Sequence, residues 1–304
     1  MITIGMWNVF WQALDDPLGQ QAVSDALNNG GAFDAFAILE AAGSIAHHPA
    51  WVKASASRFV RIMGADAYVS GRSGHEQIAI WYRSTAWTLR WHALGEFEPG
   101  RPHLLVLLER KSDEAQVWMM AVHLPHAGYP GEPHPPVGHR ISQAISAGLA
   151  ANPSATADNL IILGDFNEFG ECDASGRCSS ESFRDARSAF APMYSDWPRL
   201  VDVTPFNLTT CCTKWHWEGA PDWRHHFDHI WTSLKADRPP ELMPYSYPGR
   251  QADGLDRPAC ANAACTGDWP PGGRGNGKML LAHGTWHRGL KVQLRLQSPQ
   301  AAQY

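Results

Sequence analysis

Charged residues are scarce in this chain of 304 residues, and no block of basic residues stands out. Asp, Glu, Lys and Arg make up 18% of the sequence, against roughly 25% in ordinary soluble domains, and the formal net charge is −5. This composition argues against a large static basic surface for nucleic acid. It does not exclude nucleic acid as a substrate, because bound divalent cations can supply positive charge locally.

Long apolar runs are also missing, although hydrophobic residues reach 44% of the chain. No run approaches the roughly 18 residues of a membrane span, so we expect no transmembrane segment. The first residues, MITIGMWNVFW, lack the basic start and the cleavage site of a signal peptide, and they predict a strand instead. We therefore expect a cytoplasmic protein, unless the sequence is the processed form of a secreted one.

The cysteines do not follow the C-x2-C pattern of zinc knuckles. All of them fall in predicted loops and in pairs: Cys172 with Cys178, Cys211 with Cys212, and Cys260 with Cys265. An even count in three pairs fits disulfides, which would imply an oxidising compartment. Six reduced thiols are the alternative, and the sequence leaves both open.

Short strand patterns dominate the chain, with a few helices between them. The continuous apolar run NLIILGDFNEFG is typical of a buried strand that leads into a functional loop. Helical spacing predicts helices at 18–29 and 140–152. Other strands are predicted at 2–10, 33–41, 227–234 and 289–296, with one hairpin formed by 76–83 and 88–94 and a second by 103–110 and 116–124.

The order of these elements favours a single α/β domain on mixed or mostly antiparallel sheets. No internal repeat is present, and nothing between residues 1 and 234 resembles a linker. We therefore expect residues 1–304 to form one domain and the protein to be a monomer. Long irregular insertions are predicted at about 168–227 and 235–282.

Polar residues recur where predicted strands end. Any one of them alone is more often structural than catalytic. Together, Asn, Glu and Asp offer the oxygen ligands that hard divalent cations prefer, and His offers proton transfer near neutral pH. The set consists of Asn8, Glu40, His123, Asp165, Asn167, Asp228 and His287.

The order of these residues resembles the endonuclease/exonuclease/phosphatase superfamily, the DNase I-like proteins. The matching pieces are WNV, LE, VHL, GDFN, DHI and a histidine before the last strand, and GDFN after an apolar strand is the most specific. The resemblance implies a four-layer α/β/β/α sandwich, with two mostly antiparallel mixed sheets face to face and helices outside. It also implies a phosphoric ester hydrolase that requires one or two Mg²⁺ or Mn²⁺ ions.

The resemblance also implies roles on the metal side of the site. Glu40, supported by Asn8, would bind the ion. Asp165 and Asn167 would orient and activate the attacking water, or hold a second ion.

On the phosphate side, the resemblance implies that His123 and His287 contact the phosphate and that Asp228 fixes the tautomer of His287. Arg101, in GRPHLL, matches an arginine that some members use near the phosphate. Two imidazoles and a cation would neutralise the charge that develops as water attacks a phosphodiester.

The sequence departs from the family pattern directly before His287. The family usually has Ser-Asp-His there, whereas this chain has Thr-Trp-His, with Trp286 in place of the aspartate. An indole offers no lone pair to a cation, so we expect the metal site to be weaker, differently built or dispensable. His283 is either a substitute ligand or a plain loop residue. Trp286 could instead stack on a ring of the substrate. A zinc-protease motif is excluded, because HGTWH lacks the glutamate after its first histidine.

Three interpretations of the function follow. The first is an active phosphodiesterase of the nuclease type, which the retained polar set favours. The second is a phosphatase or other hydrolase of a small phosphorylated molecule or a phospholipid, since long insertions around a pocket narrow specificity. The third is a non-catalytic or repurposed relative, in view of Trp286.

Overall fold

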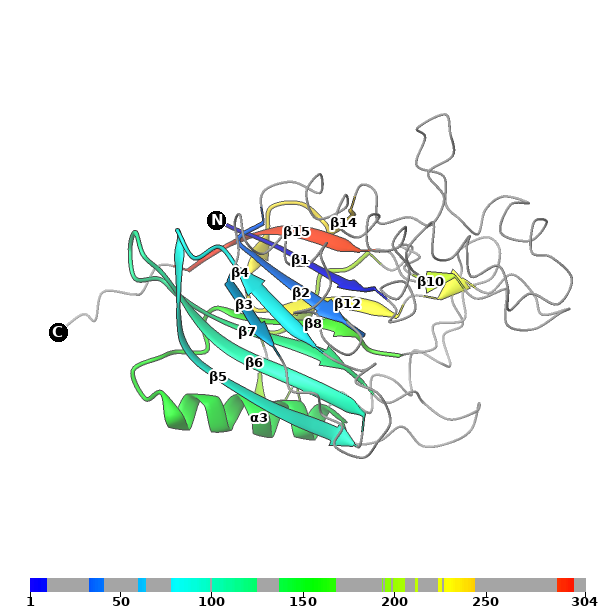
Figure 1. Ribbon diagram of the computed structural model, residues 1–304, viewed down its shortest axis with the longest axis horizontal. Helices are drawn as coiled ribbons and strands as arrows, with labels where there is room; N and C mark the ends of the chain where they lie inside the picture. The colour runs from blue at the N-terminus through cyan, green and yellow to red at the C-terminus, as the bar shows by residue number, and fades with distance from the viewer. Residues whose placement is uncertain are drawn as a thin grey trace, which may run out of the picture.

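The computed structural model describes the strands, one long helix and the segments next to them. These residues are 1–9, 33–40, 60–63, 78–98, 100–124, 137–167, 193, 195–197, 199–205, 211–212, 224–225, 227–243 and 289–297. Two large β-sheets make up most of this part of the chain (Figure 1).

Sheet A contains the N-terminal and C-terminal strands. Its order is β13-β15-β1-β2-β4-β3, and β14 also pairs with β15. The pair β1–β2 is parallel and the other pairs are antiparallel. The strands are β1 (Ile2–Asn8), β2 (Ala35–Leu39), β3 (Val60–Met63), β4 (Ala79–Tyr82), β13 (Lys235–Ala236), β14 (Glu241–Leu242) and β15 (Leu290–Arg295).

Sheet B contains the middle of the chain, in the order β5-β6-β7-β8-β12-β9. The pair β7–β8 is parallel, and the others are antiparallel. Its strands are β5 (Trp87–Glu98), β6 (Arg101–Arg110), β7 (Gln116–His123), β8 (Leu160–Asp165), β9 (Val201–Asp202) and β12 (Asp228–Thr232). The short strands β10 (Cys211–Cys212) and β11 (Arg224–His225) form a separate pair.

The two sheets pack face to face through side chains of alternating residues. Ile2, Ile4 and Met6 of β1 belong to the same buried cluster as Ile161 and Leu163 of β8. Since side chains alternate between the two faces of a strand, every second residue of β1 and β8 faces the other sheet. The next residues in this alternation, at the ends of the strands, are polar and close the core between the sheets.

The other face of sheet B packs against α3 (Val137–Ala151), which runs along the outer side of β5 and β6 in Figure 1. Ile141 and Ile145 of this helix are fully buried against Trp118 and Met120 of β7. Full burial of each isoleucine contributes about 2 kcal/mol relative to leaving it exposed. None of the helices described here has the length and apolarity that crossing a bilayer demands.

The predicted fold is confirmed in its central layers: two mixed, mostly antiparallel sheets lie face to face, with α3 outside sheet B. Sheet A is buried on its other face as well, through Trp7, Phe36 and Trp81. The helix predicted at 140–152 is α3, and the last strand shows the predicted alternation of buried and exposed residues. The helix predicted at 18–29 lies outside the described residues.

One predicted hairpin is wrong. The segments 76–83 and 88–94 contain β4 and the first part of β5, but β4 belongs to sheet A and β5 to sheet B. Both edges of β4 are already paired, with β2 and β3, so no edge remains for β5. The turn at 84–86 therefore carries the chain from one sheet to the other. The second predicted hairpin, β6 with β7, is confirmed.

Other predictions fall on residues that the structure does not describe. Four of the six cysteines lie there, and only the backbone of Cys211 and Cys212 is described, so disulfides stay a prediction. Most of the insertions at 168–227 and 235–282 also lie there. A single domain over residues 1–304 likewise stays a prediction.

His103 on β6 gives sheet B a pH-sensitive position. Its ring lies over Gly95 of β5 and next to Phe97, and burial lowers its pKa from 6.5 to about 4. Between these two pH values His103 is protonated in the unfolded chain and neutral in the folded protein. The free energy of unfolding therefore falls as the pH drops through this window. The loss amounts to about 3 kcal/mol at most.

We expect His103→Phe to flatten this acid dependence, because the ring contact is kept and the titrating group is removed. The variant should also be more stable at pH 7, because Nδ1 of His103 is buried with no hydrogen-bond partner among the described residues. Urea unfolding at pH 7, 5.5 and 4.5 measures both effects. If the free energy of unfolding fell equally with pH in the variant and in the native protein, His103 would not be the group that causes the acid dependence.

Candidate active site

Sheet B places three polar side chains in one row at the ends of neighbouring strands. His123 ends β7, Asp165 ends β8, and Asp228 begins β12; in the strand register, Asp165 lies beside both His123 and Asp228. All three continue the alternation of the residues that face sheet A. They are almost completely buried, so the row lies at the end of the core between the sheets.

Sheet A brings two more side chains to the same place. Asn8 ends β1 in the alternation that faces sheet B, whereas Glu40 follows Leu39 of β2 and would point away from it. Glu40 has a φ of 51°, in the left-handed region, which costs a non-glycine residue about 1 kcal/mol or more. This turn of the backbone brings its carboxylate back toward Asn8.

Asn8 joins the two sheets at the centre of the site. Its Nδ2 donates to Oε1 of Glu40 at 2.8 Å and to Oδ2 of Asp165 at 2.9 Å. One amide group thereby holds a carboxylate from each sheet, although Asn8 and Asp165 are 157 positions apart in the chain. Two negative charges placed side by side in a buried site are an arrangement that a divalent cation stabilises.

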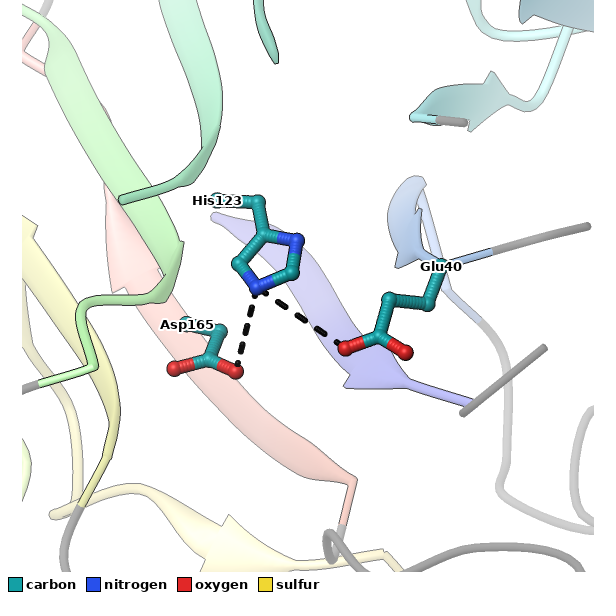
Figure 2. A group of neighbouring side chains, drawn as sticks. All are labelled: Glu40, His123 and Asp165. Atoms are coloured by element: carbon teal, nitrogen blue, oxygen red, sulfur yellow. Dashed lines mark ion pairs between the residues drawn. The ribbon is translucent and has the colours of Figure 1, made fainter. Parts of the chain in front are cut away.

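The imidazole of His123 faces both carboxylates (Figure 2). Its Nε2 lies 3.8 Å from Oε1 of Glu40 and 3.7 Å from Oδ2 of Asp165, which is too long for direct hydrogen bonds. One ligand atom from each of the three residues lies within 4.8 Å of the others. Two carboxylates with an amide and an imidazole beside them fit a divalent cation such as Mg²⁺ or Mn²⁺ held through oxygen.

Arg101 supplies a positive charge at the ring of His123, at the same nitrogen, Nε2, that faces the two carboxylates. Its Nη1 lies 2.7 Å from Nε2 of His123, and it begins β6, the strand beside β7. The same Nη1 lies 3.3 Å from Nδ1 of the ring, and since a guanidinium can only donate, the imidazole accepts in this contact. The placement of Arg101 next to His123 puts a cationic donor close to the buried carboxylates, where an anionic substrate would need one.

Asn167 shapes the loop that carries Asp165. Its backbone N–H donates to Oδ1 of Asp165 at 2.8 Å, and its Nδ2 donates to the carbonyl of Leu124 at 2.9 Å. Its φ of 50° is left-handed, a conformation that asparagine tolerates better than most residues. The contact with Leu124 uses one of the two hydrogens on Nδ2, so Asn167 can act on a water through Oδ1 or through the second hydrogen.

The remaining predicted site residues, His283, Trp286 and His287, lie outside the described residues. The strand that follows them is informative, because Leu290 at the start of β15 pairs with Met6. The chain therefore enters β15 at the end of sheet A where Asn8 lies. The roles assigned to these three residues stay predictions.

Sequence reasoning missed an Asp–His pair behind the site, in which His229 is buried and Asp202 is partly exposed. Nδ1 of His229, on β12, lies 2.7 Å from Oδ2 of Asp202, on β9. His229 directly follows Asp228 in FDHIW, but nothing in the sequence connects it with Asp202, 27 residues earlier. The pairing of β9 with β12 brings them together.

The comparison with family models agrees with this geometry. Residues 7–247 match the endonuclease/exonuclease/phosphatase family, and this range contains every described residue of the site. The chain belongs to the endonuclease/exonuclease/phosphatase family. A search among curated proteins found no match.

Solved structures of the same fold cover nearly the whole chain. The mannosyl-6-phosphatase of Bacteroides thetaiotaomicron has a TM-score of 0.61 at 14% identity, covering 97% of this chain and 100% of that one. The catalytic domain of human Nocturnin, with a bound sulfate anion, has 0.58 at 14%, covering 97% and 94%. TDP2 of D. rerio, in complex with a single-strand DNA product, has 0.54 at 14%, covering 97% and 98%. At this identity these likenesses concern the fold.

Proposed function

We propose that this protein is a phosphoesterase that depends on Mg²⁺ or Mn²⁺ and hydrolyses a phosphodiester by attack of an activated water. The observation that carries the proposal is the meeting of Glu40 from sheet A with Asp165 and His123 from sheet B, with Asn8 bridging the carboxylates. Hydrolases of phosphoric esters belong to this family, and the donor set is the kind that such chemistry requires.

On the metal side, Glu40 and Asp165 would hold the ion through their carboxylates, and Asn8 keeps these groups in place. The ion would act as a Lewis acid on a phosphoryl oxygen. Asp165 also accepts a proton from the attacking water, while Oδ1 of Asn167 orients that water. The hydrogen bond from the backbone of Asn167 to Asp165 keeps these two groups in register.

On the phosphate side, Arg101 and His123 supply donors for the charge that builds up during attack. In the absence of a phosphate, Arg101 donates to Nε2 of His123; an anionic phosphate is a stronger acceptor for the guanidinium. His287, with its tautomer set by Asp228, would add the second imidazole, as the family resemblance implies.

Two observations guide our choice of substrate class, the net charge of the chain and the variety of proteins that share its fold. A net charge of −5 favours a substrate recognised at the site itself over one held by a broad basic surface. The similar structures include one named for a sugar phosphate and one bound to a DNA product, so both a monoester and a nucleic acid are sensible assay substrates. A phosphodiester is our first choice, and a small phosphorylated molecule or a phospholipid headgroup is the alternative.

The test is a substrate panel with controlled metal. We expect the protein with Mn²⁺ or Mg²⁺ to hydrolyse bis-p-nitrophenyl phosphate faster than p-nitrophenyl phosphate, with plasmid DNA and RNA as further diesters. EDTA should abolish turnover, because without the cation the two carboxylates repel the negatively charged phosphate. An excess of Mn²⁺ should restore turnover.

Three other results would contradict parts of this proposal. Turnover of the monoester alone would replace the diesterase proposal with a phosphatase. Absence of turnover on every substrate, together with no heat of Mn²⁺ binding by calorimetry, would contradict the metallohydrolase and leave a binding protein. Full activity in EDTA after extensive dialysis would contradict the metal requirement.

A further inference from the structure

We propose that Asp202 and His229 form a positioning pair that sets the geometry of the segment Asp165–Asn167 from behind. This inference rests on the proposed function, since that segment carries the proposed water-activating carboxylate. The pair belongs to the face of sheet B opposite the site, so neither residue reaches the reacting atoms. Its action is transmitted through Phe166.

The pair is firmly built. Oδ2 of Asp202 accepts from Nδ1 of His229 at 2.7 Å, and Oδ1 accepts from the backbone N–H of Thr204 at 2.9 Å. The hydroxyl of Thr204 in turn accepts from the backbone N–H of Ile230 at 2.8 Å. Because the carboxylate accepts, the proton of this contact is on Nδ1, and the ring of His229 is held in one orientation.

Strand alternation separates this pair from the site. Ile230 faces sheet A, whereas Trp231 belongs to the cluster on the α3 side of sheet B. His229 shares the parity of Trp231, and Asp202 lies opposite Trp231 in the register of β9 with β12. His229 is only 3% exposed, so an unpartnered or tilted imidazole would be costly there, whereas Asp202 is partly exposed.

Phe166 connects the pair to the site. Its ring meets the ring of His229 edge-on, with centroids 5.3 Å apart, and lies over Trp231 at 6.2 Å. Phe166 stands between Asp165 and Asn167, and the latter two are joined by the hydrogen bond at Oδ1 of Asp165. A rotation of Phe166 would therefore move the Asp165 carboxylate, and a misplacement of about 1 Å costs roughly 100-fold in rate.

Four variants separate the ring from its hydrogen bond. Asp202→Ala removes both accepting oxygens, and Asp202→Asn keeps one, which can accept from Nδ1 of His229 while the contact with the N–H of Thr204 is lost. His229→Phe keeps an aromatic edge against Phe166 without the donor, and His229→Asn keeps a donor without the ring. We expect kcat for the diester to fall about 10- to 100-fold in Asp202→Ala and in both His229 variants, with KM changed less than about 3-fold. Asp202→Asn should recover most of the activity that Asp202→Ala loses.

Two further readouts do not depend on turnover. Calorimetry should show weaker Mn²⁺ binding in Asp202→Ala, because the segment that is displaced carries Asp165, one of the proposed ligands of the ion. 4-Fluorophenylalanine placed at residue 166 should give a shifted or broadened ¹⁹F signal in Asp202→Ala. Asp237→Asn is the matched control, since it removes one carboxylate that is bound to Arg295 at an exposed edge, and it should leave all three readouts unchanged.

The outcomes distinguish this inference from the proposed function. A lower melting temperature with unchanged kcat, unchanged Mn²⁺ affinity and an unchanged ¹⁹F signal would reduce the pair to a packing feature and overturn the inference. If the native protein hydrolyses no phosphoester, the proposed function fails, but the Mn²⁺ and ¹⁹F measurements still decide whether Asp202 and His229 position the segment. A kcat loss in Asp202→Ala that Asp202→Asn reverses supports it.

Discussion

Replacing Asp165 with asparagine is expected to lower kcat for a phosphodiester by on the order of 10³-fold. The carboxylate receives Nδ2 of Asn8 on one oxygen and the backbone N–H of Asn167 on the other, so it is held toward the space between the sheets. Asparagine keeps the size of the side chain but removes the negative charge, the proton acceptor and one of the two oxygens that accept from Asn8 and Asn167. We expect the fold to persist with the loss of this one hydrogen bond, while both metal binding and proton transfer are lost.

Turnover of bis-p-nitrophenyl phosphate at saturating Mn²⁺, with Mn²⁺ affinity from calorimetry, measures this effect. The matched control is Asp158→Asn, which removes a carboxylate from an exposed ion pair with Arg199 and should keep full activity. If Asp165→Asn retained more than about a tenth of the native kcat, Asp165 would not be the residue that activates water.

The second large effect concerns stability. Gly164 precedes Asp165 with a φ of 152°, and a Cβ at this position would lie 1.9 Å from the carbonyl oxygen of Val122 on β7. No rotamer can relieve a contact with backbone, so β7 and β8 would have to separate where the site is built. We expect Gly164→Ala to destabilise the protein by about 4 kcal/mol, at the high end for a single substitution.

Gly148→Ala in α3 is the comparison. Its Cβ would lie 2.9 Å from Cδ2 of Leu105 and 3.0 Å from Trp118, both side-chain contacts, and alanine favours the helix over glycine by about 1 kcal/mol. We expect Gly148→Ala to lower the free energy of unfolding by only about 1 kcal/mol. Urea unfolding of both variants measures the difference, and equal losses of stability would show that the contact with Val122 can relax.

Much of the fold was predictable because burial imposes a period on the sequence. The alternation in the last strand and the apolar run before GDFN correspond to β15 and β8. The pairing of β4 was not predictable in the same way. A short turn after 76–83 suggested a hairpin, yet β4 is paired on both edges by β2 and β3, and local periodicity does not tell a strand which partners it will have.

The candidate site was predictable in its residue types but not in its contacts. Polar residues at strand ends identified Asn8, Glu40, His123 and Asp165, and the structure brings these four together. The left-handed backbone of Glu40 had no signal in the sequence, because that conformation is usual for glycine and not for glutamate. Without it, the alternation of β2 would direct this carboxylate away from Asn8.

The sequence by itself determined the family, the strand-end residues and the chemistry that these residues can offer. The tertiary structure decided which of them meet: Asn8 with Asp165 across two sheets, Arg101 with His123 across two strands, and Asp202 with His229 behind the site. The physical reason is that side-chain alternation is a local property of each strand, whereas these contacts depend on strand pairing and on the packing of the sheets, which bring distant parts of the chain together.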